Sequence, residues 1–198
     1  MVATPQLLVP SWEEVYALLA EVANRIRLNY RPEVVVGVAR GGLIPARIIA
    51  DLLDISTIGS IGVTFYEDVG QPMRNPIITQ PLNVTVLYKC ILLVDDIVDT
   101  GKSLALVASK IRRRAAELRT ATIYRKPSAC VVPDYFAEET DVWVVFPWEL
   151  RETIKKISRK LLSSGMTVLE VQSYFRAVGL DNKYARTCLK EVCEGSYP

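Results

Sequence analysis

The stretch that decides the fold reads Ile91-Leu-Leu-Val-Asp-Asp-Ile-Val-Asp-Thr-Gly-Lys-Ser103. Its first four apolar residues predict a buried strand, which runs into two adjacent carboxylates and then into a Thr-Gly-Lys-Ser turn that opens a helix. In open α/β sheets ligands bind at the carboxyl ends of strands, and these residues occupy such an end. The turn offers backbone N–H groups at a helix N-terminus and the hydroxyls of Thr100 and Ser103, and Gly101 lets the backbone approach a ligand closely. The segment therefore favours a phosphate monoester.

Two common nucleotide-binding motifs do not fit this segment. A Walker A motif needs a glycine five residues before Gly101, where Asp96 stands, and no Gly-x-Gly-x-x-Gly occurs anywhere in the chain. Asp95 and Asp96 could accept hydrogen bonds from ribose hydroxyls, directly or through Mg²⁺. Helix capping would account for Asp99 alone, but not for three carboxylates at one buried strand end. The segment therefore predicts a ligand with both a phosphate and a diol.

Outward from this segment, strand and helix patterns alternate. We expect strands at 33–38, 57–65, 84–88, 91–94, 120–125 and 141–146. We expect helices after a capping box at 11–14, at 43–53 and at 101–118. This alternation predicts a doubly wound, mostly parallel α/β sheet. The stretches 67–81 and 127–139 show no periodic pattern and are expected to be irregular, the first as a functional or mobile loop.

After residue 149 the pattern becomes purely helical, with segments at 150–162, 168–178 and 182–192. Gly165 and Gly179 are placed to end two of these helices. We therefore expect one domain over 1–150 and a helical extension over 151–198. Arg112–Arg114, late in the helix 101–118, are expected only to complement the helix dipole.

Composition excludes several classes of function. The chain has 24 basic and 22 acidic side chains, a balance that does not indicate a nucleic-acid partner. It contains no histidine, which removes histidine triads and most zinc sites. The four cysteines form no Cys-x-x-Cys pair, and we expect all of them to be structural, with Cys90 and Cys130 as small core residues. No apolar run approaches the length of a membrane span and no signal peptide is recognised, so we expect a cytoplasmic protein without a membrane partner.

The segment Val94–Ser103 resembles the signature with which type I phosphoribosyltransferases bind 5-phosphoribosyl-1-pyrophosphate (PRPP). The segment Val36-Gly-Val-Ala-Arg-Gly-Gly-Leu-Ile-Pro45 is similar to the pyrophosphate loop of that family. Its own chemistry agrees, because an arginine and exposed glycine amides suit a dianionic group. The resemblance implies a cis peptide at Ala39–Arg40. It also assigns the pyrophosphate to Arg40, Gly41 and Gly42, the ribose or Mg²⁺ to Asp95 and Asp96, and the 5′-phosphate to Asp99, Thr100, Gly101, Lys102 and Ser103.

Two further segments, Tyr124-Arg-Lys-Pro127 and Asp141-Val-Trp-Val-Val-Phe-Pro-Trp-Glu149, look like the 6-oxopurine branch of the family. The resemblance implies a small hood at about 124–149 that binds the base through Lys126, Trp143, Val144 and Glu149. Lys126 would contact the purine 6-oxygen, because an ammonium group only donates hydrogen bonds and mismatches the amino group of adenine. Trp143 would stack on the purine, although an ordinary core aromatic stays an alternative for this residue, and Trp148 is expected to serve packing.

The resemblance implies a Mg²⁺-dependent transfer of the phosphoribosyl group from PRPP to guanine, hypoxanthine or xanthine, which yields GMP, IMP or XMP and pyrophosphate. Asp99 would act as general base or stabilise the base during transfer, and the loop 67–81 would close over the site. A homodimer or homotetramer is expected. A regulator that senses PRPP or a nucleotide without transferring it stays the alternative. The extension is expected to be a helical cap rather than a nucleic-acid reader, because it carries no Lys/Arg stripe.

Overall fold

The computed structural model describes residues 4–65, 75–180 and 182–194. It divides into two compact units, and each is described by itself: Glu13–Asp141, and Met1–Trp12 together with Val142–Pro198. Among the described residues, no helix is both long and apolar enough to cross a membrane. The division expected from the sequence, a domain over 1–150 and a helical extension over 151–198, stays a prediction.

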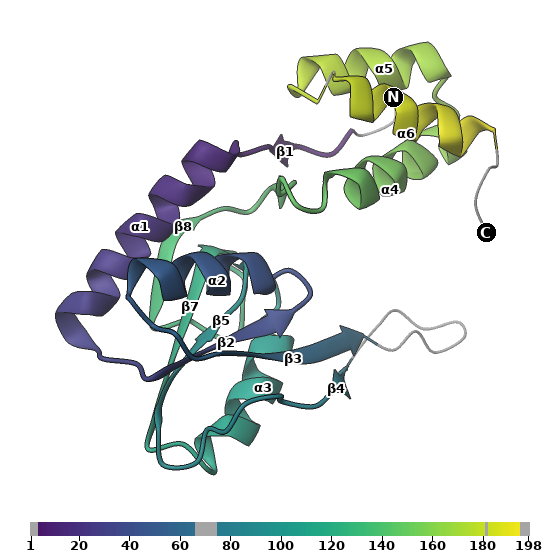
Figure 1. Ribbon diagram of the computed structural model, residues 1–198. Coiled ribbons are helices and arrows are strands. Elements are labelled where there is room, and N and C mark those ends of the chain that lie inside the picture. The colour runs from purple at the N-terminus through teal and green to yellow at the C-terminus, as the bar shows by residue number, and fades with distance from the viewer. Residues whose placement is uncertain (1–3, 66–74, 181, 195–198) are drawn as a thin grey trace. The chain divides into compact units, whose positions relative to one another are not determined.

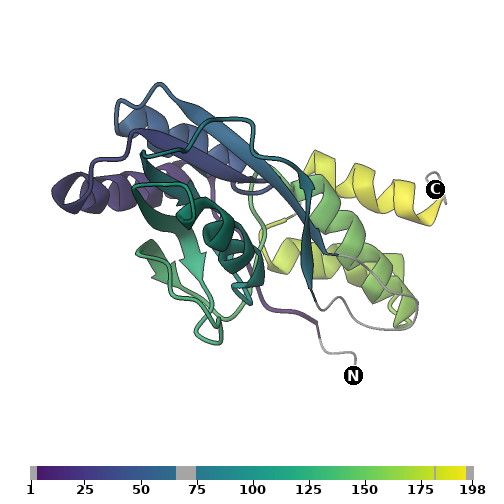
Figure 2. The ribbon, with the colours of Figure 1, turned by 90° about the horizontal axis from the view of Figure 1, so that it is seen from below.

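The unit Glu13–Asp141 is built on a seven-stranded sheet with the order β4-β3-β2-β5-β7-β6, and β8 also pairs with β7. The β3–β4 pair is antiparallel and the other pairs are parallel. Helices α1 and α2 lie on one face of the sheet and α3 on the other (Figures 1 and 2). This arrangement confirms the doubly wound, mostly parallel α/β fold. The bounds are α1 (Trp12–Asn29), β2 (Val34–Ala39), α2 (Leu43–Leu52), β3 (Ile58–Phe65), β4 (Pro76–Gln80), β5 (Cys90–Val94), β6 (Ile97–Val98), α3 (Lys102–Arg112), β7 (Glu117–Arg125) and β8 (Tyr135–Glu139).

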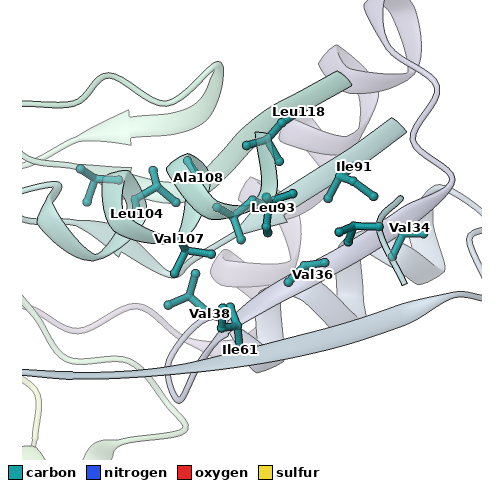
Figure 3. Close-up of a cluster of buried hydrophobic side chains, with 13 residues drawn as sticks. Val34, Val36, Val38, Ile61, Ile91, Leu93, Leu104, Val107, Ala108 and Leu118 are labelled. Carbon is teal, nitrogen blue, oxygen red and sulfur yellow. The ribbon is translucent and has the colours of Figure 1, made fainter. Parts of the chain in front are cut away.

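A core of apolar side chains lies between α3 and the sheet, whose central strand is β5. Four consecutive residues of this strand, Ile91–Val94, are fully buried because helices cover both faces of the sheet. Alternate residues of β2 and β5 point toward α3, where they meet its apolar stripe (Figure 3). This packing fixes the carboxyl ends of β2 and β5 side by side, with Gly37 opposite Val94 in the register.

Two predictions of regular structure in this unit are wrong. Residues 84–88 form no strand: Tyr88 has φ +57° and its N–H donates to the carbonyl of Arg114 at 2.8 Å. The alternating valines of that segment pack on the core from an irregular segment, so their spacing reflects burial and not sheet pairing. The helix 101–118 ends at Arg112, where the N–H groups of Arg114 and Ala115 both bond to the carbonyl of Ile111 and close the last turn.

Both stretches expected to be irregular contain a strand. β4 lies at the edge of the sheet and β8 pairs with β7, and neither has a strong apolar alternation. Strands of this kind are held by backbone hydrogen bonds to a distant partner, which local sequence patterns do not report. Residues 67–74 of the first stretch, and with them the expected closure of the loop, lie outside the described residues.

The second unit contains β1 (Leu7–Leu8) paired in parallel with β9 (Trp143–Val144), followed by α4 (Leu150–Ser163), α5 (Val168–Ala177) and α6 (Lys183–Cys193). The expected strand 141–146 is therefore only two residues long and pairs outside the seven-stranded sheet. The three helices are confirmed and share an apolar core. Gly165 and Gly179 have φ +94° and +77°, which confirms them in the left-handed conformation typical of helix ends.

All four cysteines are free. Cys188 is buried and Cys90 is half-buried, as expected of structural residues. Cys130 is exposed, so its assignment to the core is wrong. It lies in a turn where its N–H and its thiol both contact the carbonyl of Thr100, at 3.1 and 2.8 Å.

Candidate active site

The site forms where the ends of two neighbouring parallel strands meet. The connection from β2 to α2 contains the expected cis peptide at Ala39–Arg40. A Cβ atom on Gly41 would lie 2.0 Å from Oδ2 of Asp96, and one on Gly42 would lie 2.6 Å from the carbonyl oxygen of Val94. The contacts at Gly42 are with backbone atoms and leave no room for a side chain, and a side chain at Gly41 would displace the Asp96 carboxylate. The structure therefore places the expected pyrophosphate loop directly against the carboxylates at the end of β5.

Asp95 and Asp96 are held by short local hydrogen bonds. Oδ1 of Asp95 accepts the N–H of Asp96 at 3.0 Å, and Oδ1 of Asp96 accepts the N–H of Ile97 at 2.8 Å. Loss of solvent raises the pKa of Asp95 well above its ordinary value, and the negative charge of Asp96 raises it further. A cation beside the pair would oppose this shift, because it favours the ionised carboxylates.

The phosphate turn begins helix α3. Gly101 has φ +85° and stands immediately before the helix, and an added Cβ would lie 3.0 Å from the backbone nitrogen of Val131. A side chain at this position would therefore be strained by its backbone conformation and by the neighbouring segment. Oγ1 of Thr100 accepts the N–H of Lys102 at 3.4 Å. The turn thus presents a glycine and hydroxyl side chains at a helix N-terminus, which is an anion-binding arrangement.

A pocket of about 380 Å³ joins the end of β5 to this turn. We call it the phosphate pocket, and its lining is Phe65, Asp95, Ile97, Val98, Asp99, Thr100, Gly101, Ser103 and Leu104. Five of these residues were expected at the site from the sequence. Phe65, Ile97, Val98 and Leu104 were not, because apolar residues in strands and helices carry no local sign that they border a cavity.

Lys126 reaches Asp99 from the neighbouring strand. Its N–H donates to the carbonyl of Val98 at 2.8 Å, which anchors the residue beyond the end of β7. Its Nζ lies 3.3 Å from Oδ1 of Asp99, whose side chain is 66% exposed. An ion pair with one such exposed partner contributes at most about 1 kcal/mol, so a ligand can replace either partner at little cost.

The other expected base-binding residues, Trp143, Val144 and Glu149, belong to the second compact unit. Their meeting with Lys126 therefore stays a prediction. Trp143 is 36% exposed and Nζ of Lys156 lies 4.9 Å from the centroid of its ring, so this residue is not an ordinary core aromatic. Trp148 stacks on Phe146 at 4.6 Å, which agrees with the packing role expected for it.

The chain is similar in sequence and in structure to several known proteins. The family model described as "Phosphoribosyl transferase domain" matches residues 11–154. The xanthine-guanine phosphoribosyltransferase of Idiomarina loihiensis is 31% identical over 143 residues, which cover 71% of this chain and 85% of that protein. A protein of the same name from Cereibacter sphaeroides is 34% identical over 146 residues, with the same coverage. The crystal structure of a purine phosphoribosyltransferase from Pyrococcus horikoshii is similar with a TM-score of 0.65 and 38% identity, over 72% of this chain and 93% of that one.

Proposed function

This chain belongs to the phosphoribosyl transferase family, in its 6-oxopurine branch, and we propose that it transfers the phosphoribosyl group of PRPP to guanine, hypoxanthine or xanthine. The products are the nucleoside monophosphate and pyrophosphate. The observation that carries the proposal is the junction of the loop 39–42, the carboxylates Asp95 and Asp96, and the phosphate turn in one compact unit. These three elements match the three parts of PRPP, which are its pyrophosphate, its ribose and its 5′-phosphate.

Each part of PRPP meets groups of suitable chemistry. The 5′-phosphate binds at the turn of Asp99, Thr100, Gly101, Lys102 and Ser103, where a helix N-terminus and hydroxyls supply donors. The pyrophosphate binds at Arg40, Gly41 and Gly42, whose guanidinium and amides offset its charge. The ribose hydroxyls lie between these two groups and donate to Asp95 and Asp96.

Magnesium fits the donor set of the site. Mg²⁺ in such sites is held by one or two carboxylates, and the oxygens of the substrate's phosphates complete its coordination. Asp95 and Asp96 supply the two carboxylates, and the described residues contain no cluster of three or more ligating side chains that would hold a metal alone. When bound, Mg²⁺ would neutralise part of the negative charge of the departing pyrophosphate.

The transfer breaks the bond between the anomeric carbon of ribose and a pyrophosphate oxygen, and forms a bond from that carbon to an imidazole nitrogen of the purine. Asp99 stands at the rim of the phosphate pocket and accepts the proton that the purine loses. Lys126, 3.3 Å from Asp99, donates to the purine 6-oxygen. Adenine presents an amino group there, and the unpaired donors would disfavour it strongly. The family resemblance also assigns Trp143, Val144 and Glu149 to the base; they belong to the second compact unit, and their roles stay predictions.

The test is steady-state nucleotide formation from PRPP and Mg²⁺ with guanine, hypoxanthine, xanthine, adenine or orotate. We expect turnover with at least one 6-oxopurine and little with adenine or orotate. Asp96→Asn should remove most of this turnover, whereas Asp51→Asn, an exposed carboxylate in the last turn of α2, should retain it. Turnover with adenine or orotate only would contradict the base-binding roles proposed for Lys126 and Trp143. Binding of PRPP without any turnover would indicate that the protein is a PRPP-sensing regulator and not a transferase.

Four finer points of the proposal can be measured separately. The panel of bases decides whether GMP, IMP or XMP is the main product. Omission of Mg²⁺ should abolish turnover. Sedimentation velocity should give a homodimer or homotetramer, and fractionation of cells should place the protein in the cytoplasm.

A further inference from the structure

A second pocket, of about 430 Å³, lies in the same compact unit at the opposite end of α3. We call it the α3 C-terminal pocket. Helix α3 begins at the phosphate pocket and ends here, and its eleven residues span about 16 Å. The helix packs against β4, whose residues supply part of the second pocket (Figure 1). The two pockets are therefore separate, and the second takes no part in the proposed transfer.

The walls of this pocket are aliphatic and its charged residues are all basic. The lining consists of Ile61, Ile78, Pro81, Leu82, Val86, Ile111, Lys110, Arg113 and Arg114. It contains no acidic, aromatic, hydroxyl or amide side chain among the described residues. Such walls have nothing with which to recognise the edge of a base or a sugar, but they suit an aliphatic body.

The positive charge exceeds what the helix end requires. Lys110, Arg113 and Arg114 are exposed, and none of them has an ion-pair partner in the ranges 4–65, 75–180 and 182–194. The end of a helix carries about half a negative charge, so one basic side chain is enough to balance it. The remaining charges repel one another until an anion binds between them. The role expected from the sequence, balance of the helix dipole, therefore explains only part of this cluster.

We propose that the α3 C-terminal pocket is a second ligand site for an amphiphilic organic anion, an aliphatic chain that ends in a carboxylate or phosphate. The chain would lie against Ile78, Leu82 and Ile111, and the anionic end would bind the guanidinium groups of Arg113 and Arg114. Guanidinium groups bind carboxylates and phosphates through two parallel hydrogen bonds. The volume of the pocket falls in the range of about 300–1,000 Å³ that is typical of small-molecule sites.

Calorimetric titration of the full chain with octanoate tests the proposal. We expect saturable binding of one octanoate per chain, and weaker binding of both octanol, which lacks the charge, and acetate, which lacks the aliphatic body. The double variant R113Q/R114Q should weaken octanoate binding by about tenfold or more, because two charged hydrogen-bond donors are lost. R112Q is the matched control: Arg112 lies on the same helix end but does not line the pocket, so its removal should change binding less than about twofold.

Several outcomes would overturn the proposal. Equal weakening in R112Q and R113Q/R114Q would reduce the effect to general attraction by a basic surface. Binding of many octanoate molecules, unchanged in either variant, would indicate detergent-like adsorption. Sedimentation with phosphatidylglycerol vesicles without binding of free octanoate would assign the cluster to a lipid surface. Thermal denaturation of each variant confirms that the chain is folded, and Asp99→Asn should bind octanoate normally, so failure of this proposal is separable from failure of the proposed transferase activity.

Discussion

Substitution of Gly42 by alanine tests the contact between the pyrophosphate loop and strand β5. The added Cβ would lie 2.6 Å from the carbonyl oxygen of Val94, 2.7 Å from that of Val38 and 2.9 Å from Cα of Asp95. All three atoms belong to the backbone, so no change of side-chain rotamer relieves the overlap. Ordinary contacts of a Cβ begin at about 3.4 Å, and the loop must therefore move by about 0.5–0.8 Å.

The size of the effect follows from this displacement. β5 is central and its residues Ile91–Val94 are fully buried, so the loop rather than the sheet gives way. Overpacking of this kind destabilises a protein by about 1–3 kcal/mol. A misplacement of about 1 Å in a substrate-positioning group costs up to about 100-fold in rate. We expect kcat/KM for PRPP to fall by about 10- to 100-fold, which corresponds to about 1.4–2.7 kcal/mol of transition-state stabilisation.

The assay compares kcat/KM for PRPP and the melting temperature of the wild type, Gly42→Ala and Gly165→Ala. Gly165 is the control, because its φ of +94° makes alanine unfavourable while an added Cβ has no atom within 4 Å. Gly165→Ala should lower stability by about 1–3 kcal/mol and retain the activity per folded molecule. A value of kcat/KM for Gly42→Ala within threefold of the wild type, at unchanged melting temperature, would refute the close packing of this loop on β5.

Three further predictions concern Asp99 and Lys126, which form an ion pair beyond the ends of β6 and β7, and Asp134, which bonds to Thr120 within β7. Asp99→Asn should lower kcat by about 100-fold or more, while the affinity for PRPP in a binding titration changes little; an equal loss of affinity would remove the catalytic role. Lys126→Gln should raise the ratio of adenine to guanine turnover, and an unchanged ratio would contradict its contact with the 6-oxygen. Asp134→Ala should lower the free energy of unfolding by about 1–3 kcal/mol in urea, because the buried N–H and hydroxyl of Thr120 lose their partner at 2.8 Å. Burial alone would raise the pKa of Asp134, but hydrogen bonds from Thr120 and Arg119 outweigh it and lower the pKa below the ordinary 3.8. The stability that depends on the ionised form of Asp134 is thus fully present above its ordinary pKa of 3.8 and is lost as the pH falls through its lower folded pKa, so a difference between wild type and variant that does not decrease as the pH falls below 3.8 would contradict this account.

Local patterns predicted the elements that carry the chemistry. The apolar run of β5, the glycine that precedes α3 and the glycines that end two helices of the second unit each depend on a few neighbouring residues. Their physical causes are burial on both faces of a strand and the conformational freedom of glycine, and both leave clear traces in sequence. The cis peptide at Ala39–Arg40 came from the family resemblance and not from the residues themselves.

Elements that depend on partners far away in the sequence were not predicted correctly. The edge strand β4 is defined by backbone hydrogen bonds to β3, and the alternating valines at 84–88 bury themselves without any strand pairing. An apolar alternation reports only that every second side chain is buried. It does not report whether the backbone between those side chains has a neighbouring strand.

Residue types and short spacings were sufficient to predict a buried strand that runs into carboxylates, a glycine turn before a helix and a glycine-rich loop, and the motifs in these segments carried the resemblance to the family. The tertiary structure alone decided that Gly41 lies against Asp96, fifty-five positions later in the chain, because the parallel pairing of β2 with β5 aligns the two strand ends. It also decided that Lys126 meets Asp99 and that three basic residues at the end of α3 surround an aliphatic pocket. Such contacts arise from the sheet order and from side-chain packing between segments far apart in sequence, and no local pattern encodes them.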